Sequence, residues 1–502
     1  MKPFNSPSGD FGLSISDLNF KYQQKQVLKG LNWAIRSGEQ WVLTGASGSG
    51  KSTLAKIIAG STKGFDGHIE LNFKAHTPAK ATALYVESWY QFKNLEGVAN
   101  FYYQQRYTSL QAKDTLTVNA ELGAFGRLHN LSVLALDELL SQLGFSELKD
   151  SQLIELSSGE HKKLQLVKAL WLKPQLLIID QPYTGLDAAS RKNLNQLLDE
   201  VTQAGVHLIL ITNDDELPTC INKIAKLHDG VMEELSSFES SSALPKHYQK
   251  TIPSFLQQPP SYTSDLIARM ENVSVSYGDK EVLKNINWEV RAGEKWLLKG
   301  PNGSGKSTLL SLINGDHPQS YANTLYLFGQ KRGSGESIWD IKEHIGLISP
   351  EFHWYFDANA TVWESIASGL YDSVGLFKQL PYSKSIQVDE LVAYFDLSDD
   401  KNEFLHTLPL GKQRLVLLAR TIIKNPELLI LDEPCQGLDQ QQTNYFNALV
   451  DELCGNGMTL IYVGHQESAL PNCLEQKIEL ENGSVKIIES IKNKDRLSTL
   501  VE

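Results

Sequence analysis

The sequence lacks a long apolar run. None of its 502 residues belongs to a stretch approaching the roughly 18–20 consecutive apolar residues that a membrane-crossing helix needs. Residues 1–10 are polar and hold no apolar core of a secretion signal. We therefore expect a cytoplasmic protein, which reaches the inner face of the cytoplasmic membrane only through a partner.

Cysteine pairs and excess positive charge are also missing. The four cysteines form no C-x-x-C pair, which argues against zinc ribbons and iron–sulfur clusters and favours reduced structural thiols. The formal net charge of −12 argues against nucleic acid as a partner, because nucleic-acid-binding proteins usually present a basic surface. The hydrophobic content of 41% is that of an ordinary globular protein, and the length allows about two to four domains.

Two glycine-rich loops with one spacing, G-x-x-x-x-G-K-[ST], are the strongest positive signal. They occupy residues 45–52 and 300–307. In this pattern, backbone N–H groups and one lysine surround the phosphates of a nucleotide such as ATP, and the loop passes into a helix. The candidate phosphate-binding residues are Gly45, Gly48, Gly50, Lys51, Ser52 and Thr53 in the first loop and Gly300, Asn302, Gly303, Gly305, Lys306, Ser307 and Thr308 in the second.

Each loop is followed, later in the chain, by an unbroken apolar run that ends in aspartate. The runs are Leu176–Asp180 and Leu428–Asp432, and such runs are typical of central parallel strands covered on both faces. The aspartates are then expected at the carboxyl ends of their strands, where α/β folds bind ligands. Hydroxyl and carboxylate oxygens suit Mg²⁺. The candidate metal ligands are therefore Ser52, Asp180, Ser307 and Asp432.

The two halves repeat one another in order, which indicates an internal duplication. The same number of residues separates Tyr22 from Lys51 and Tyr277 from Lys306. Each half opens with alternating apolar residues typical of an antiparallel β layer, followed by a short apolar strand before the loop. Between the copies, residues 236–265 are rich in Pro, Ser and Gln without apolar periodicity. We expect a first domain at 11–235, a linker at 236–265 and a second domain at 266–502.

A further motif points to a family. In the first copy, Leu156-Ser157-Ser158-Gly159-Glu160 stands between the loop and the aspartate, and it resembles the LSGGQ signature of ATP-binding-cassette (ABC) ATPases. A Gly-Leu-Asp sequence follows the aspartate in both copies, at 185–187 and 437–439. The resemblance implies an α/β fold with two tandem ABC-type P-loop domains. Each would combine a mixed core sheet, an antiparallel β layer and a helical subdomain.

The resemblance also implies roles for further residues. Tyr22 and Tyr277 match the aromatic side chain that stacks on adenine, and the alternative is a tyrosine that simply ends a buried strand. Ser157 and Gly159 match the signature residues that face the γ-phosphate of ATP bound to the partner domain. The halves are then expected to pair head to tail within one chain, as a monomer that hydrolyses ATP.

The residues expected to perform hydrolysis are intact only in the second copy. Glu433 is a carboxylate that can deprotonate the attacking water, whereas Gln181 holds that place in the first copy. His465 matches the histidine that contacts the γ-phosphate in ABC ATPases. The corresponding residue in the first copy is Asn213. Glu433 and His465 are therefore the candidate catalytic residues.

The signature has decayed in the opposite copy. Pro409 stands where the first copy has Ser157, and it supplies neither a hydroxyl group nor an N–H donor. In a head-to-tail pair, the three departures at Gln181, Asn213 and Pro409 all belong to the site that contains Lys51. We expect one hydrolytic site, formed by the second loop and the signature around Ser157, and one site that mainly holds ATP. The alternative is that both sites turn over.

One departure concerns coupling to a partner. ABC domains usually place a glutamine after the strand to which Ile345–Ile348 corresponds, and Pro350 stands there. In the first copy Glu87 follows the corresponding strand, with Gln91 nearby. The resemblance therefore does not extend to this coupling residue in the second copy.

Two segments of the second copy, 311–319 and 333–342, resemble tandem ABC ATPases associated with bacterial molybdate transport. This implies an ATPase that docks on separate transmembrane subunits, and the molybdate link comes from the resemblance alone. The alternative is a soluble ATP-driven switch that acts on a ribosome, a nucleic acid or a regulatory partner. A third possibility, nucleotide binding without turnover, is opposed by Glu433 and His465.

Overall fold

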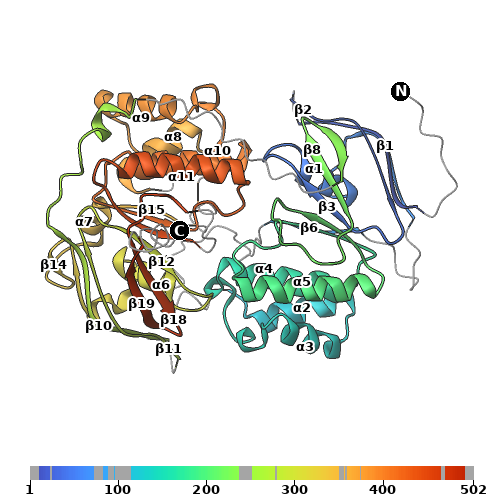
Figure 1. The fold of residues 1–502 in the computed structure, drawn as a ribbon, viewed down its shortest axis with the longest axis horizontal. Helices are drawn as coiled ribbons and strands as arrows, with labels where there is room; N and C mark the ends of the chain where they lie inside the picture. Colours follow the sequence, from blue (N-terminus) through green and yellow to red (C-terminus); the bar gives the residue numbers. More distant parts are fainter. Residues whose placement is uncertain are drawn as a thin grey trace, which may run out of the picture. The chain divides into compact units, whose positions relative to one another are not determined.

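The computed structural model describes residues 11–22, 25–72, 83–88, 95, 115–236, 251–277, 280–349, 356, 359–373, 375–464 and 470–491. These residues fall into two compact units, the first within 11–236 and the second within 251–491. Both units follow one plan, with a core sheet, an antiparallel layer and a group of helices (Figure 1). The exact domain boundaries expected from the sequence remain predictions.

The first unit contains a six-stranded core sheet and a three-stranded antiparallel layer. Its elements are β1 (Phe11–Tyr22), β2 (Lys25–Arg36), β3 (Trp41–Thr44), α1 (Lys51–Ile58), β4 (Asp66–Leu71), β5 (Ala83–Val86), α2 (Val118–His129), α3 (Val133–Gln142), α4 (Ser158–Trp171), β6 (Leu176–Asp180), α5 (Ala188–Gln203), β7 (His207–Ile211), β8 (Lys223–His228) and β9 (Val231–Leu235). The core sheet has the order β5-β6-β7-β3-β8-β9 and the layer the order β2-β1-β4. Among the described strands of this core sheet, β9 alone pairs antiparallel, and its partner is β8.

The second unit repeats this arrangement with one additional short strand in its layer. Its elements are β10 (Leu266–Tyr277), β11 (Lys280–Arg291), β12 (Lys295–Lys299), α6 (Lys306–Ile313), β13 (Thr324–Leu327), β14 (Gln330–Lys331), α7 (Ile338–Glu343), β15 (Ile345–Ile348), α8 (Val362–Ala367), α9 (Tyr382–Tyr394), α10 (Leu410–Ile422), β16 (Leu428–Asp432), α11 (Gln440–Cys454), β17 (Thr459–Val463), β18 (Gln476–Glu481) and β19 (Ser484–Ser490). The core sheet runs β15-β16-β17-β12-β18-β19, and the layer runs β11-β10-β13-β14.

The two apolar runs that end in aspartate are interior strands of the core sheets. β6 is buried at every position, and β16 is buried up to Asp432. β6 pairs in parallel with β5 and β7, and β16 pairs in parallel with β15 and β17. The prediction of central parallel strands is confirmed, and it places both aspartates at the carboxyl edge of a sheet.

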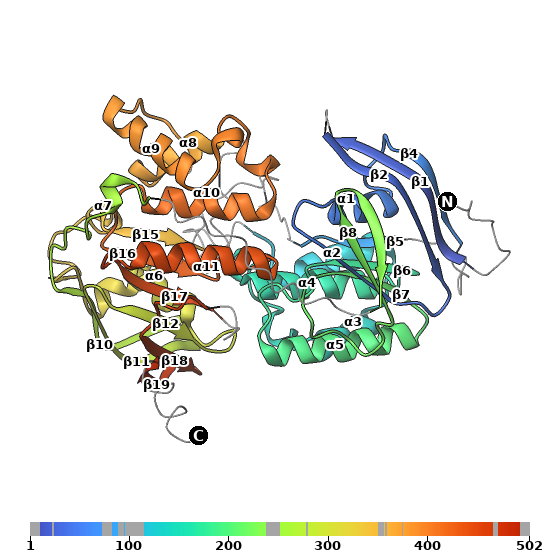
Figure 2. The same cartoon turned by 45° about the horizontal axis from the view of Figure 1, so that its top comes forward.

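Alternate residues of each core sheet serve two hydrophobic cores. In the second unit, Leu431 and Tyr462 pack with α8, α9, α10 and α11, whereas Ile430 and Val463 pack with α6 and the antiparallel layer. The first unit divides in the same way, with α2 to α5 on one face and α1 on the other. Figure 2 shows α10 and α11 side by side over one face of the second core sheet. The helix that follows each phosphate loop is therefore enclosed between two β layers.

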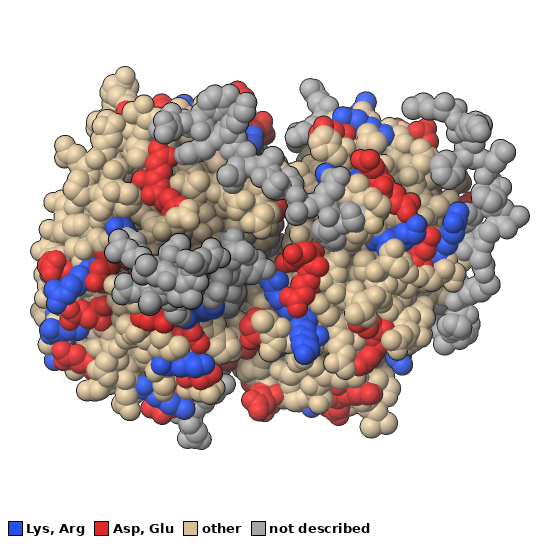
Figure 3. Space-filling view, in the orientation of Figure 1, with Lys and Arg blue, Asp and Glu red and all other residues tan. Residues whose placement is uncertain are grey.

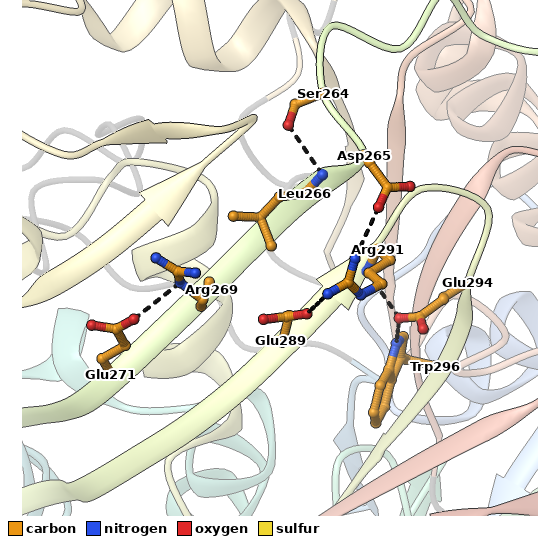
Figure 4. Close-up of polar contacts among 9 residues, drawn as sticks. All are labelled: Ser264, Asp265, Leu266, Arg269, Glu271, Glu289, Arg291, Glu294 and Trp296. Atoms are coloured by element: carbon orange, nitrogen blue, oxygen red, sulfur yellow. Dashed lines mark hydrogen bonds and ion pairs between the residues drawn. The ribbon is translucent and has the colours of Figure 1, made fainter.

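Polar contacts fix the start of the antiparallel layer in the second unit (Figure 4). Arg291, the last residue of β11, donates to Asp265 Oδ2 at 2.9 Å, just before β10 begins. Glu294 accepts from Arg291 N at 2.9 Å and from Trp296 Nε1 at 2.8 Å. The first unit repeats these turn contacts around Glu39. The turn that leads from the layer into the strand before each phosphate loop is therefore built twice in the same way.

Residues 251–265, in the second part of the expected linker, pack against the second unit. Leu256 lies at the end of a short 3-10 helix (Ser254–Leu256) and is buried in the same core as α11. Tyr262 Oη donates to Gly457 O at 2.5 Å, in the turn between α11 and β17. This segment, which has no apolar periodicity, is held by single anchoring side chains.

A buried carboxylate, Glu427, adds a further anchor for the same segment. Thr263 donates to Glu427 Oε2 from its backbone N at 3.1 Å and from Oγ1 at 3.2 Å. The other oxygen, Oε1, pairs with His344 Nδ1 at 2.7 Å. The nearby carboxylate raises the pKa of His344, because it favours the protonated imidazole. The carboxylate thus connects the residues before β10 with the residue that precedes β15.

No α-helix in the described parts of the chain is both long and apolar enough to cross a membrane. The longest of these helices, α5, has 16 residues and buries only one face, through Leu194, Leu197 and Leu198. A spanning helix needs about 20 predominantly apolar residues.

Charges of both signs are intermixed on the face of the molecule that Figure 3 shows. Exposed ion pairs such as Lys223–Glu234 and Lys486–Glu481 join neighbouring strands. Because solvent screens such pairs, they add little to stability and affect solubility more.

Candidate nucleotide sites

Each phosphate loop begins where a core strand ends and finishes as the first turn of a helix. β3 passes through the first loop into α1, and β12 passes through the second into α6, so the predicted strand, loop and helix are confirmed twice. Glycine is required at both loop starts, since a Cβ on Gly45 would lie 2.3 Å from Leu227 O and a Cβ on Gly300 would lie 2.5 Å from Leu480 O. The other predicted residues of the loops and first helical turns are Gly48, Gly50, Ser52 and Thr53, and Asn302, Gly303, Gly305, Ser307 and Thr308.

The loop lysines are buried and fold back over their own loops. Lys51 Nζ donates to Gly45 O at 2.6 Å and to Ala46 O at 2.8 Å. Lys306 makes the same two bonds, at 2.8 Å and 3.0 Å, to the first two carbonyl groups of its loop. The ammonium groups are thereby held beside the backbone amides of a helix start, which together form an anion site that fits the phosphates of ATP.

The first unit brings together the two groups predicted to hold Mg²⁺. Ser52 Oγ donates to Asp180 Oδ2 at 2.5 Å, at the carboxyl end of β6. A hydroxyl group beside a carboxylate is the donor set that Mg²⁺ accepts next to nucleotide phosphates, so these residues fit the ion. In the second unit, Ser307 lies in the first turn of α6 and Asp432 ends β16, the corresponding places.

A tyrosine that the sequence reasoning missed also contacts this carboxylate. Tyr85, in β5, donates from Oη to Asp180 Oδ2 at 2.8 Å. Burial, together with the negative charge of Asp180, raises the pKa of Tyr85 well above its ordinary value. The phenol therefore stays protonated and remains a hydrogen-bond donor to the carboxylate.

Lys162 joins two strand ends of the first unit and was also missed. From α4, its buried Nζ donates to Asp180 O at 2.6 Å and to Glu87 O at 2.8 Å. Burial lowers the pKa of Lys162 to about 7, although both carboxylates favour its charged form. The helix that follows the signature thus holds the ends of β5 and β6 together.

Of the residues at the expected glutamine positions, Gln91 and Pro350 lie outside the described residues.

Glu433 and Gln181 occupy equivalent backbone positions. Both adopt a left-handed conformation, with φ of 45° and 50°. The N–H of Glu433 donates to Val463 O at 3.1 Å, and that of Gln181 donates to Ile211 O at 2.9 Å. The two sites therefore differ here in side-chain chemistry rather than in backbone geometry.

The loop after Glu433 contains a further residue that contacts the candidate base. Gln436 Nε2 donates to Glu433 Oε2 at 3.0 Å, a contact that orients the carboxylate. In the same loop, burial raises the pKa of Cys435 to about 12, so its thiol is protonated at neutral pH and poorly reactive. The signal for Gln436 in the sequence is its position three residues after Glu433. The motifs that predicted the site do not include that position.

Asn213 is bound to the phosphate loop of its own unit. Its Oδ1 accepts from Thr44 Oγ1 at 2.6 Å and from Gly45 N at 3.1 Å. The amide oxygen is thus engaged at the start of the loop, and a neutral amide is a weaker partner for phosphate than an imidazolium. The corresponding His465 lies outside the described residues, so its role stays a prediction.

The two signatures start their helices differently. Ser157 is the N-cap of α4: its Oγ accepts from Glu160 N at 3.3 Å, while its own N–H donates to Glu160 Oε2 at 2.7 Å. Gly159 is buried in the first turn of this helix. Pro409 takes the N-cap place before α10 and makes no side-chain cap. The first signature therefore presents a capped helix start with a hydroxyl group. The second signature has neither the side-chain cap nor the hydroxyl group.

The candidate adenine-stacking residues end equivalent strands of the two antiparallel layers. Tyr22 is the last residue of β1 and is 62% exposed, and Tyr277 is the last residue of β10 and is 40% exposed. Tyr277 Oη also bonds to His317 Nε2 at 2.8 Å. Both rings can be reached by a flat ligand, and their stacking on adenine stays a prediction.

Comparison with known proteins identifies the family of the chain. The family model described as ABC transporter matches residues 28–184 and 283–436. The ABC transporter ATP-binding protein ModF of Escherichia coli (strain K12) is 34% identical over 486 residues, covering 93% of this chain and 96% of ModF. An uncharacterized ABC transporter ATP-binding protein of Schizosaccharomyces pombe is 30% identical, with coverage of 92% and 96%. CbiO1 of Clostridium perfringens, a solved structure, is 24% identical and covers 47% of this chain and 95% of its own, with a TM-score of 0.41.

The chain therefore belongs to the ABC transporter family, and it is an ATPase with two ATP-binding domains in tandem. Its similarity to ModF extends over nearly the whole of both chains. The α/β fold and the tandem ABC ATPase class implied by the sequence motifs are both confirmed.

Proposed function

We propose that the chain hydrolyses ATP at one site and retains ATP at the other. The observation that carries this proposal is the equivalent backbone placement of Glu433 and Gln181, which leaves a carboxylate in one unit and an amide in the other. A carboxylate accepts a proton from the attacking water and an amide does not. Loss of a general base typically costs about 10²–10⁴-fold in rate.

The hydrolytic site combines groups from both halves of the chain, paired head to tail as in the family. Lys306, Asp432, Glu433 and His465 act on ATP held by the second loop, and Ser157 with Gly159 completes that site from the other half. Lys51, Asp180, Gln181 and Asn213 face the signature around Pro409. The domains extend over about 11–235 and 266–502.

Mg²⁺ is proposed as the cofactor of both sites. Bound beside Ser307 or Ser52, it supplies positive charge for the phosphate oxygens. The chain's own groups perform the remaining tasks: the loop amides and lysines bind and orient the phosphates, and Glu433 takes the proton from the attacking water.

The test of this proposal is to count the nucleotide that stays on the protein after turnover. Wild-type protein is incubated with ATP and Mg²⁺, free nucleotide is rapidly removed, and the bound ATP and ADP are separated by chromatography. We expect about one ATP per chain, absent from Lys51→Ala and present in Lys306→Ala, because the first site binds without hydrolysis. ADP recovered in equal amounts from both sites would contradict the proposal.

The ATPase is further proposed to serve transport, through separate transmembrane subunits at the inner face of the cytoplasmic membrane. The ABC transporter family and the similarity to ModF support this partner class, and the name ModF is the only link to molybdate. The second candidate is a soluble ATP-driven switch that acts on a ribosome, a nucleic acid or a regulatory protein. The acidic net charge of −12 weighs against its nucleic-acid form.

A capture experiment separates these two candidates. Tagged Glu433→Gln protein is loaded with ATP in gently solubilised cells, because loss of the base should prolong the ATP-bound state. We expect integral membrane subunits to be enriched over a Lys306→Ala control, which binds no ATP at the hydrolytic site. Enrichment of ribosomal proteins or of a soluble regulator in their place would favour the switch.

A further inference from the structure

A buried histidine contacts Tyr277, the candidate adenine-stacking residue of the second unit. Tyr277 Oη bonds to His317 Nε2 at 2.8 Å, and the other ring nitrogen, Nδ1, accepts from Gln319 N at 3.2 Å. Because a backbone amide can only donate, Nδ1 carries no hydrogen, and in the neutral imidazole the hydrogen lies on Nε2. His317 therefore donates to the tyrosine oxygen, and its own ring, only 1% exposed, has little room to turn.

The short segment between α6 and β13, which contains this histidine, is itself bound along the end of β10. Two side-chain amides continue the pairing of β10 beyond β13. Asn323 accepts from Ser274 N and donates to Ser274 O, both at 2.9 Å. Gln319 does the same with Ser276, at 3.2 Å and 2.7 Å. The backbone is thus paired up to the residue before Tyr277, so both the strand end and the phenol oxygen are held in place.

The corresponding residue of the first unit, Tyr22, is held less closely. It is 62% exposed, against 40% for Tyr277. Within the described residues of the first unit, β4 pairs with β1 as far as Asn19, three residues before the end of that strand. No hydrogen bond of the Tyr22 hydroxyl group occurs among the described residues. The two candidate base sites therefore differ in how firmly the aromatic ring is oriented.

We propose that His317 is a positioning residue, which orients Tyr277 for stacking on the adenine of a nucleotide held by the second phosphate loop. A side chain that is already oriented loses less freedom when the ligand binds, so the hydrogen bond tightens the binding of nucleotides that carry a base. The inference rests on the proposed binding of ATP by the second loop and on the predicted stacking of Tyr277. It does not depend on the division into a hydrolysing and a retaining site.

The test compares ADP, which carries the base, with pyrophosphate, which occupies the phosphate loop alone. Lys51→Ala protein is used so that only the second loop binds. The dissociation constant for ADP is measured by equilibrium dialysis with Mg²⁺, and that for pyrophosphate by its displacement of labelled ADP. His317→Leu should weaken ADP binding about threefold to tenfold and leave pyrophosphate binding within about twofold. His317→Gln, whose amide can donate from near the place of Nε2, should restore most of the ADP affinity.

Tyr277→Phe approaches the same contact from the other side, since it keeps the ring and removes the oxygen that His317 contacts. It leaves the buried imidazole in place, so it decides the matter if His317→Leu fails to fold. Its loss of ADP affinity should equal that of His317→Leu, and the double variant should lose no more than either, because both changes remove one contact. Tyr22→Phe on the Lys306→Ala background is the matched comparison and should cost less than Tyr277→Phe.

Unchanged ADP affinity in Tyr277→Phe, an equal loss for pyrophosphate, or an equal loss in Tyr22→Phe would overturn the inference and leave His317 a packing residue. Tyr277→Ala tests the stacking itself and should weaken ADP binding at least about tenfold, the scale of a base stacked on an aromatic ring. Unchanged affinity there would reject the stacking and the inference with it. The nucleotide retained after turnover tests the division between the sites separately, so the two failures are distinguishable.

Discussion

Replacement of Glu433 by glutamine is expected to lower the steady-state ATPase rate at least about 100-fold. The change keeps the size of the side chain and its place beside Gln436, but it removes the atom that accepts the proton of the attacking water. Phosphate release at saturating ATP measures the effect. ATP binding should be retained, because the loop lysine and amides that hold the phosphates are unchanged.

The matched control is Gln181→Ala, at the equivalent backbone position of the first unit. We expect it to lower the rate less than about tenfold, because the amide it removes cannot serve as a base. Equal losses from Glu433→Gln and Gln181→Ala would show that both sites turn over, and the division between the sites would have to be abandoned.

Ser157→Asp is expected to have the second largest effect, also a loss of about 100-fold in ATPase rate. In the proposed pairing Ser157 faces the γ-phosphate held by the second loop, and a carboxylate there would repel the phosphate oxygens. Aspartate is also a good N-cap, but it replaces the hydroxyl that donates to Glu160 Oε2 at 2.8 Å, so some stability at the start of α4 should be lost. A thermal melt of the same protein separates the effect of the new charge on the rate from an effect of unfolding.

Pro409→Asp introduces the same charge at the other signature. It should change the ATPase rate by only a few-fold, because in the proposed pairing Pro409 faces the site that retains ATP. The helix α10 gains a capping side chain that it lacks, which at about 1 kcal/mol should leave the protein no less stable. A rate loss in Pro409→Asp as large as that in Ser157→Asp would contradict the proposed pairing of loops and signatures.

The sequence allows the fold to be predicted in some detail, because its signals are local. An apolar run of strand length, a glycine-rich turn and a helix start are each encoded within a few residues, as in the stretch from β3 to α1. The duplication strengthens each of these predictions, since β12 and α6 repeat the pattern. The positions of Asp180 and Asp432 at strand ends follow directly from these local signals.

The contacts around the sites could not be predicted, because they depend on which residues face one another across strands and helices. Tyr85 reaches Asp180 only through the register of β5 on β6, and Lys162 reaches the same strand end from α4. The sequence shows only that Asn213 stands where ABC ATPases have a histidine. Its hydrogen bond with Gly45 depends on the folded structure. Composition also gave no sign that Tyr262 is anchored to the second unit.

The anchoring of residues 251–265 bears on how the C-terminal half should be produced for separate experiments. A recombinant fragment begun at residue 266 would lack Leu256, Tyr262 and Thr263. It would uncover an apolar surface beside α11 and deprive the buried Glu427 of two donors, at a cost of about 1–3 kcal/mol for such a group. A fragment that starts at or before residue 251 preserves these contacts and is the better choice for expression.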